Sequence, residues 1–390
     1  MRLYRTRRSV DCLVLITSIA ICSFCMAVAG AGAQSALLDD RVVKVTDAAK
    51  VEAARAAMVR HIWGTDWASV LAKRPNSVDR NYAPTELDAL PRNLANLQRI
   101  DRLDVTTAAP ITTSGARSVE SKAFVFHPSG SPKRVVIVHH GHGCALDGID
   151  GGNFGLDASI RQLLGANFIV VGMRMPLYQR PTACSGRSLR ETHNQLFGVK
   201  LQSGTALQFF LEPVARVVNF LGEAHPQLPI DMVGLSGGGW TTTVYPALDP
   251  RIKLSFPVAG SIPLYLRAGA SAGDLEQTVK EFYAIAGYKD LYILGALGPG
   301  GRKQIQILNR RDNCCFGEAQ HKGLPATTPS YELAIKDYEK EIQGILTKVD
   351  RCAVFRVVID DVAQAHQISS HSLSTIILPQ LTAPAAACAR

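Results

Sequence analysis

From residue 134 on, short continuous runs of hydrophobic residues alternate with amphipathic stretches. Continuous apolar runs are typical of strands buried on both faces, and apolar positions repeating every three or four residues are typical of helices. The predicted strands cover 103–107, 121–127, 134–140, 168–173, 230–234, 252–258, 304–308 and 353–359, and the main predicted helices 157–164, 213–224 and 331–348. This alternation predicts an α/β fold with a doubly wound, mainly parallel sheet.

The hydrophobic pattern is weaker before the first of these strands. Residues 34–100 are rich in alanine and polar residues, and they contain one predicted helix over 47–62 that ends before Gly64. We therefore expect a helical N-terminal extension over 34–100 and a main α/β domain over 101–390. Two segments of that domain are long for their places and are expected to be insertions: 177–205, which should overhang the site, and 262–300, a candidate lid.

The extreme N-terminus predicts an export signal. Four arginines precede a long apolar stretch, and Ala31-Gly32-Ala33 follows it as a small-residue cleavage site. This pattern predicts a signal peptide over 1–33 and a secreted or periplasmic protein. The alternative is a membrane anchor, because the apolar stretch is long for a signal peptide. The small residues favour cleavage, after which we expect no membrane attachment.

Charge and cysteine content narrow the class of protein. The formal net charge is +9, but four of the arginines lie in the predicted signal and no basic run follows, so a nucleic-acid partner is not expected. The mature region keeps an even number of cysteines and no C-x-x-C pair, which favours disulfides over structural zinc. These cysteines are Cys144, Cys184, Cys314, Cys315, Cys352 and Cys388.

The sequence GLSGG over 234–238 places a serine, Ser236, where a predicted strand ends and a helix should begin. Such a turn crowds the positions two residues before and after the serine, and glycine removes the Cβ atoms that would clash there. The turn would expose the serine hydroxyl as a nucleophile. A second G-x-S-x-G centred on Ser271 lacks a preceding strand, and we interpret it as a small-residue loop that caps a helix at Asp274.

A serine nucleophile of this kind needs an acid and then a base later in the chain. Asp312 follows the strand over 304–308, and His366 follows the last strand, so these two are predicted to complete a catalytic triad with Ser236. His371 is an alternative base. The alternative acids, for which a solvated position is the preferred interpretation, are Asp360, Asp361 and Glu318.

The loop after the strand over 134–140 reads HGHGC and is predicted to help form an oxyanion hole. We assign the first donor to the N–H of Gly237 and the second to the N–H of His142 or Gly143. A His-x-His pair can also bind a metal, but Cys144 stands where a two-metal hydrolase would need an acidic residue. No metal and no organic cofactor is expected.

Over about residues 100–380 the chain resembles the α/β-hydrolase superfamily, in particular secreted bacterial esterases and prolyl-oligopeptidase-like hydrolases. The resemblance rests on HHGHG, GLSGGGW, the Asp312 loop and AHQIS. It implies an α/β-hydrolase sheet, a triad of Ser236, Asp312 and His366, and cleavage of a small-molecule or polymer carboxylic ester through an acyl-enzyme. The alternatives are a peptidase of the prolyl-oligopeptidase or aminopeptidase type and a non-catalytic binding protein of the same fold. HGHG departs from the HGGG of hormone-sensitive lipases, and no motif identifies the substrate.

Two expectations follow for this fold. In the overhanging segment 177–205, the cationic residues suit a polar or anionic substrate; they are Arg180, Arg187, Arg190 and His193. Strand order also predicts a Cys352–Cys388 disulfide on the side opposite the site. The remaining four cysteines lie on the catalytic side, where Cys144 and Cys184 are expected to pair with Cys314 and Cys315, or with each other, because a bond between adjacent cysteines strains the backbone.

Overall fold

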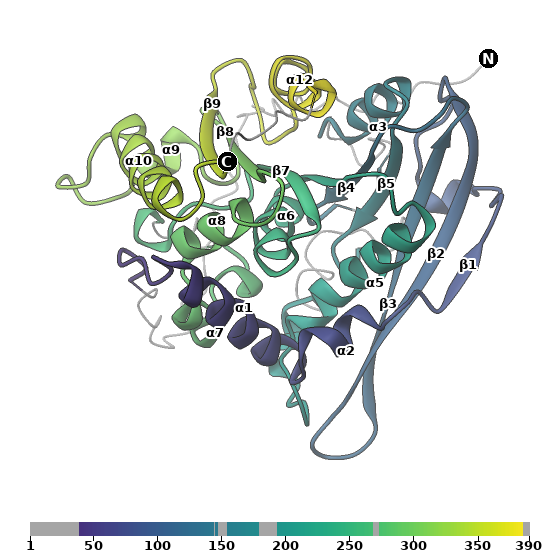
Figure 1. The fold of residues 1–390 in the computed structure, drawn as a ribbon, viewed down its shortest axis with the longest axis horizontal. Helices are drawn as coiled ribbons and strands as arrows, with labels where there is room; N and C mark the ends of the chain where they lie inside the picture. The colour runs from purple at the N-terminus through teal and green to yellow at the C-terminus, as the bar shows by residue number, and fades with distance from the viewer. Residues whose placement is uncertain (1–38, 144, 147–153, 179–192, 268–272, 385–390) are drawn as a thin grey trace, which may run out of the picture. The chain divides into compact units, whose positions relative to one another are not determined.

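The computed structural model describes residues 39–143, 145–146, 154–178, 193–267 and 273–384, which belong to one compact unit, Leu37–Arg390. Its centre is a nine-stranded sheet with the order β1-β2-β3-β5-β4-β6-β7-β8-β9 (Figure 1). The strands are β1 (Ser77–Asp79), β2 (Leu97–Pro110), β3 (Ala116–Pro128), β4 (Val135–His140), β5 (Ile169–Arg174), β6 (Ile230–Leu235), β7 (Ile252–Val258), β8 (Lys303–Asn309) and β9 (Val354–Asp360).

The sheet is mainly parallel, as the sequence predicts. Strands β4 to β9 run parallel to one another. Strands β1, β2 and β3 form an antiparallel edge, and β3 pairs with β5 in antiparallel fashion. The apolar runs therefore identified the central strands, since every residue of β4, β5 and β6 is buried. Strand β1 was not predicted, because all of its residues are exposed and no apolar pattern marks it.

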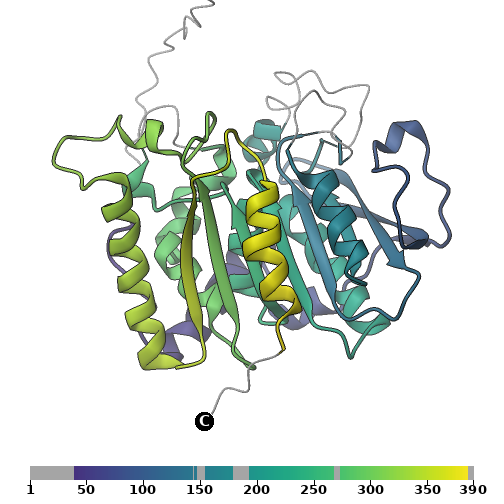
Figure 2. The same cartoon turned by 90° about the horizontal axis from the view of Figure 1, so that it is seen from above.

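Helices cover both faces of the sheet (Figure 2). One hydrophobic core lies beneath α3, α12 and the π-helical turn Leu373–Ile377, and the other lies beneath α1, α5, α6, α8 and α10. The helices are α1 (Ala48–Trp63), α2 (Trp67–Leu71), α3 (Leu156–Gly165), α5 (Gln208–Ala224), α6 (Gly237–Leu248), α7 (Lys280–Ile285), α8 (Tyr288–Ala296), α9 (Glu318–His321), α10 (Tyr331–Val349), α11 (Ser370–Ser372) and α12 (Leu378–Thr382). The helices expected over 47–62, 157–164, 213–224 and 331–348 correspond to α1, α3, α5 and α10.

The first described residues are bonded to a distant part of the chain. The Asp40 carboxylate accepts backbone N–H groups from Leu264 at 3.0 Å and Tyr288 at 3.2 Å. In return, Asp290 accepts the N–H groups of Lys44 at 2.7 Å and Val45 at 2.8 Å. These hydrogen bonds, in which each segment supplies both a carboxylate and N–H groups, hold residues 40–45 against the segment 264–290. The boundaries predicted at 33 and 100 stay predictions, and the predicted signal peptide lies outside the described residues.

The segment 262–300 is more deeply packed than a lid would be. Every residue of α8 is buried, and Trp240 of α6 donates from Nε1 to the Tyr283 hydroxyl at 2.8 Å. Tyr283 in turn stacks on Tyr288, with ring centroids 4.8 Å apart. The expectation of a lid over 262–300 is therefore wrong for the part from α7 to α8, which belongs to the core.

Among the described helices, none combines the length and the apolar character needed to cross a bilayer.

Candidate active site

Ser236 lies at a sharp turn between β6 and α6. Its backbone has φ 61° and ψ −124°, a left-handed conformation that a residue with a side chain rarely adopts. A Cβ atom on Gly234 would lie 2.2 Å from the carbonyl oxygen of Gly238, and one on Gly238 would lie 2.0 Å from that of His139. The glycines two residues to either side of Ser236 therefore let the chain pass close to itself, as the sequence motif predicts.

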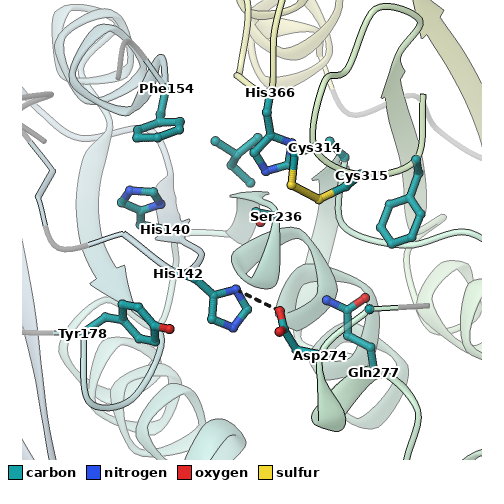
Figure 3. Close-up of a pocket in the computed structure, with 14 residues that line it drawn as sticks. His140, His142, Phe154, Tyr178, Ser236, Asp274, Gln277, Cys314, Cys315 and His366 are labelled. Atoms are coloured by element: carbon teal, nitrogen blue, oxygen red, sulfur yellow. Dashed lines mark ion pairs between the residues drawn. A yellow bond between two sulfur atoms is a disulfide. The ribbon is translucent and has the colours of Figure 1, made fainter. Parts of the chain in front are cut away.

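His366 lies on the loop after β9 and Asp312 on the loop after β8, and a hydrogen bond joins their side chains. His366 donates from Nδ1 to Asp312 Oδ2 at 2.8 Å, and Asp312 is only 2% exposed. This bond fixes the imidazole tautomer, so that Nε2 carries the free lone pair. His366 Nε2 is buried and has no hydrogen-bond partner among the described residues, and its ring lines the same cavity as Ser236 (Figure 3).

The second oxygen of Asp312 is held by the backbone. Oδ1 accepts the N–H groups of Cys314 at 2.8 Å and Cys315 at 2.9 Å. Burial by itself would raise the pKa of Asp312, but the hydrogen bonds from His366 and from these two N–H groups outweigh it and lower the pKa below the ordinary value of 3.8. The carboxylate thus stays ionised while it orients the imidazole.

The alternative acids and base are engaged elsewhere. Asp360 accepts the hydroxyls of Ser369 and Ser372, and Asp361 pairs with Arg310 on the surface. Arg310 also lies 3.6 Å from Glu318. His371 is exposed on α11 and is not among the residues that line the cavity. Ser271, in the second G-x-S-x-G, lies outside the described residues; Asp274 caps a short 3-10 helix, Leu275–Gln277.

The loop after β4 lies directly against the serine turn. A Cβ atom on Gly141 would be 2.7 Å from the Gly237 nitrogen and 2.7 Å from the Ser236 Cβ atom. The His142 ring contacts the first residue of α6, since a Cβ atom on Gly237 would lie 2.8 Å from His142 Cε1. The backbone of this loop thus approaches the N–H of Gly237, the place where an oxyanion hole with His142 or Gly143 is expected.

The two histidines that end β4, His139 and His140, are buried and neutral. Burial lowers the pKa of His139 to about 4 and, with the charge of Arg174 nearby, that of His140 to about 3. His139 Nδ1 bonds to the carbonyl of His140 at 2.8 Å, whereas neither ring nitrogen of His140 has a hydrogen-bond partner in the described part of the chain. His140 packs against Phe154 with ring centroids 5.4 Å apart and forms one wall of the cavity.

The cavity around Ser236 has a volume of about 360 Å³. None of its described lining residues is a lysine or an arginine, and Asp274 contributes a carboxylate that lies 3.4 Å from His142 Nδ1 (Figure 3). The lining residues are His140, His142, Phe154, Tyr178, Leu235, Ser236, Ala259, Gly273, Asp274, Gln277, Cys314, Cys315, Phe316 and His366. Tyr178, Asp274 and Gln277 were not predicted as site residues, because no sequence motif marks them.

His193 does not provide the positive charge expected of it. The side chain is fully buried, and burial lowers its pKa to about 4, so that the ring is neutral at neutral pH. Arg180, Arg187 and Arg190 lie outside the described residues. The described part of the site therefore gives no support for an anionic substrate.

The cysteine pairing differs from the one expected. Cys314 and Cys315 are bonded to each other, and their disulfide lines the cavity beside His366 (Figure 3). The expectation that Cys144 and Cys184 bond to them is therefore wrong, and the alternative that Cys144 and Cys184 bond to each other lies outside the described residues. Consecutive N–H groups of Cys314 and Cys315 bind one oxygen of Asp312, which holds the two residues in a turn. The predicted Cys352–Cys388 disulfide includes a residue outside the described ones and stays a prediction.

One group of possible metal ligands includes two of the proposed triad residues. Asp312, Cys314, Cys315 and His366 place donor atoms within 4.8 Å of one another. The two sulfur atoms are committed to their disulfide, however, and a thiolate is the form that binds metal. The Asp312–His366 pair is therefore better suited to proton transfer than to holding a metal.

No protein-family model matches the sequence, and no curated protein matches it. The fold matches the solved structure of methylesterase BT1017 with a TM-score of 0.51 and 13% identity, over 84% of this chain and 61% of that chain. This chain thus spans about three fifths of that one. Weaker matches include acetyl xylan esterase 1 from Thermoanaerobacterium sp. JW/SL YS485 (TM-score 0.45, 13% identity, 86% of this chain and 95% of that one). Another is the Pyrococcus horikoshii acylaminoacyl peptidase (TM-score 0.40, 13% identity, 73% and 39%).

Proposed function

We propose that this chain, which has the α/β-hydrolase fold, is a serine hydrolase that cleaves carboxylic esters through an acyl-enzyme. The observation that carries the proposal is the bond from His366 Nδ1 to Asp312, which leaves Nε2 without a partner in the cavity that Ser236 lines. A hydroxyl, an imidazole and a buried carboxylate are the parts that acyl transfer needs.

In the proposed reaction, Ser236 Oγ attacks the ester carbonyl carbon while His366 Nε2 takes the hydroxyl proton. The Asp312 carboxylate stabilises the imidazolium that forms, and the N–H of Gly237 together with that of His142 or Gly143 stabilises the oxyanion. The alcohol leaves with the proton from His366. Water then attacks the acyl-enzyme with His366 as general base, and Ser236 regains its proton.

The lining of the cavity favours a neutral, hydroxyl-rich substrate. Tyr178, Gln277 and Asp274 offer hydrogen-bonding groups near Ser236, and no described lining residue offers a cation for a carboxylate or phosphate. Acylated polyols and short-chain sugar esters have this chemistry. Methylesterase BT1017, which shares the fold, is by its name an enzyme that acts on an ester, and this is in keeping with an ester substrate here.

We also propose that the protein acts outside the cytosol, on the strength of the arginine-rich start, the apolar stretch and the Ala31-Gly32-Ala33 site in the sequence. Cell fractionation with N-terminal sequencing of the mature chain tests this. A mature protein that begins near Gln34 is expected, whereas a full-length chain in the cytosolic fraction would contradict export.

Labelling with a fluorophosphonate probe tests the nucleophile directly, because such probes react only with an activated serine. We expect the wild-type protein to be labelled, Ser236→Ala to remain unlabelled, and the matched variant Ser271→Ala to be labelled like the wild type. Labelling that persists in Ser236→Ala but disappears in Ser271→Ala would overturn the assignment.

Comparing p-nitrophenyl acyl esters with aminoacyl anilides then separates an esterase from a peptidase. Turnover of the esters alone is expected. Faster cleavage of the anilides would replace the esterase by the peptidase alternative, and a chain inert to both substrates and probe would be a binding protein.

A further inference from the structure

Three side chains from separate parts of the chain lie close together at the candidate oxyanion loop. His142 belongs to that loop, His193 precedes the 3-10 helix Leu196–Gly198, and Glu276 lies in the 3-10 helix Leu275–Gln277. One donor atom from each residue lies within 4.8 Å of the other two. The rings of His142 and His193 meet edge to face, with centroids 4.9 Å apart. None of this group has a role in the proposed acyl transfer beyond the backbone N–H of His142.

Two members of the group are buried with unused polar atoms. Glu276 and His193 are both 0% exposed. Among the described residues, neither carboxylate oxygen of Glu276 and neither ring nitrogen of His193 has a hydrogen-bond partner. Burying an ionised carboxylate is unfavourable unless it is paired or binds a metal, and a buried imidazole without hydrogen bonds is unfavourable as well. The two unsatisfied groups point to a ligand that both can bind.

The separation of His142 and Glu276 matches that of two ligands around one ion. His142 Nε2 lies 3.5 Å from Glu276 Oε1, which is longer than a normal N–H···O hydrogen bond. Two ligands at about 2.1 Å from a tetrahedral zinc ion are roughly 3.4 Å apart. The distance is therefore too long for a strong hydrogen bond but close to the separation that a shared ion imposes.

Asp274 occupies the position of a supporting residue. Its Oδ2 lies 3.4 Å from His142 Nδ1, the nitrogen on the far side of the ring from Glu276 (Figure 3). Histidines that bind a metal through one nitrogen usually donate the other N–H to a carboxylate, which fixes the tautomer and orients the ring. Asp274 thus lies beside the nitrogen of His142 that does not face Glu276.

We propose that His142, His193 and Glu276 form a binding site for a transition-metal ion of the zinc class. Two imidazole nitrogens and one carboxylate oxygen are a ligand set that suits zinc and leaves a coordination position open. The ion would neutralise the buried Glu276 and connect the segments that contain His193 and Glu276 to the loop beside Ser236. The site is separate from the proposed triad and does not depend on it. In the sequence only the His140-x-His142 pair suggests a metal ligand, because His193 and Glu276 are distant from it along the chain.

Metal binding by the purified protein tests the site. The untagged chain, kept free of reductant so that Cys314 and Cys315 remain bonded, is stripped of metal by a chelator and titrated with Zn²⁺ against a chromophoric competitor. We expect one equivalent to bind, Glu276→Gln and His193→Gln each to weaken binding by about 100-fold or more, and Asp274→Asn to weaken it by about 10- to 100-fold. The matched control is Glu281→Gln, an exposed glutamate in the same segment, which should bind like the wild type.

Thermal unfolding provides a second measurement that does not depend on activity. Zn²⁺ should raise the melting temperature of the wild type and of Glu281→Gln, but not of Glu276→Met. Without metal, Glu276→Met should melt at or above the wild-type temperature, because it removes a buried carboxylate that has no hydrogen-bond partner among the described residues. The proposal fails if the wild type binds no stoichiometric Zn²⁺, or if Glu276→Gln and His193→Gln bind Zn²⁺ as the wild type does.

Discussion

His366 and Asp312, 54 residues apart in the chain, form a hydrogen bond of 2.8 Å between Nδ1 and Oδ2. Their two loops follow adjacent parallel strands, β8 and β9, so both lie at the edge of the sheet where the carboxyl ends of the strands meet. The bond orients the imidazole toward the cavity. The importance of this bond for catalysis can be measured by replacing the Asp312 carboxylate with an amide.

Asp312→Asn should lower kcat/KM by about 10³- to 10⁴-fold, because the amide cannot stabilise the imidazolium and favours the wrong tautomer. The decrease should lie in kcat rather than KM, since Asp312 does not line the cavity. Steady-state kinetics on a p-nitrophenyl ester is the measurement. Asp361→Asn serves as the control: it changes an exposed acid that pairs with Arg310, and it should leave kcat near the wild-type value. A larger decrease in Asp361→Asn than in Asp312→Asn would exchange their roles.

The glycines of the serine turn should not tolerate even one methyl group. In Gly234→Ala the new Cβ atom would lie 2.2 Å from the Gly238 carbonyl oxygen and 2.4 Å from Thr242 Oγ1. Since backbone rather than a flexible side chain is in the way, we expect loss of activity together with a lower melting temperature.

Gly344→Ala is the comparison for that variant, because the glycine is exposed in α10 and a Cβ atom there meets nothing within 4 Å. It should stabilise the protein by about 0.5–1 kcal/mol through helix propensity. Melting curves of both variants measure the two effects. A Gly234→Ala protein with wild-type stability and activity would show that the turn is wider than described.

His140 should make the protein less stable in acid. Its pKa is lowered from 6.5 to about 3 by burial, so below pH 6.5 the unfolded chain binds a proton that the folded protein does not. The stability linked to this group is complete above pH 6.5 and is lost as the pH falls toward 3. At pH 5 the loss amounts to about 2 kcal/mol.

His140→Phe removes the titrating ring while keeping an aromatic contact with Phe154. Relative to the wild type, it should gain about 2 kcal/mol of unfolding free energy between pH 8 and pH 5, as measured by urea denaturation. The exposed His371→Gln should show the wild-type pH dependence. An identical pH dependence in His140→Phe would mean that the ring titrates normally in the folded protein.

The Cys314–Cys315 disulfide should be dispensable for the chemistry. The groups that hold Asp312 Oδ1 are backbone N–H groups, which remain when both cysteines become serine. We expect the double variant to keep most of its kcat, and peptide mapping of the wild type to find the two cysteines linked to each other. Complete inactivation of a folded double variant would show that the sulfur atoms themselves take part.

The sequence was sufficient for the central sheet because the signal there is local. Strands β4 and β6 are buried along their whole length, so their apolar runs are continuous, and the serine turn carries its steric requirement as glycines within five positions. Strand β1 has no buried residue and left no comparable pattern.

The sequence did not predict features that depend on the folded arrangement of the backbone. In the sequence, Glu276 and His193 look like ordinary polar loop residues. Only the folded chain buries their side chains and places them close to His142. The pairing of Cys314 with Cys315 was missed for a related reason. A bond between adjacent cysteines is generally unfavourable because it strains the backbone. Here the backbone of Cys314 and Cys315 is already held in a turn by Asp312, and the sequence does not show this contact.

The reciprocal bonds that Asp40 and Asp290 make have a practical meaning for anyone who shortens the gene. A protein that starts at β2 would keep every strand of the alternating region and all proposed triad residues. It would lack residues 40–45, so the side of α8 that they cover would be exposed. The backbone N–H groups of Leu264 and Tyr288 would also lose their acceptor, Asp40. Such a protein should precipitate rather than lose catalysis selectively, so the first usable start codon lies upstream of Asp40.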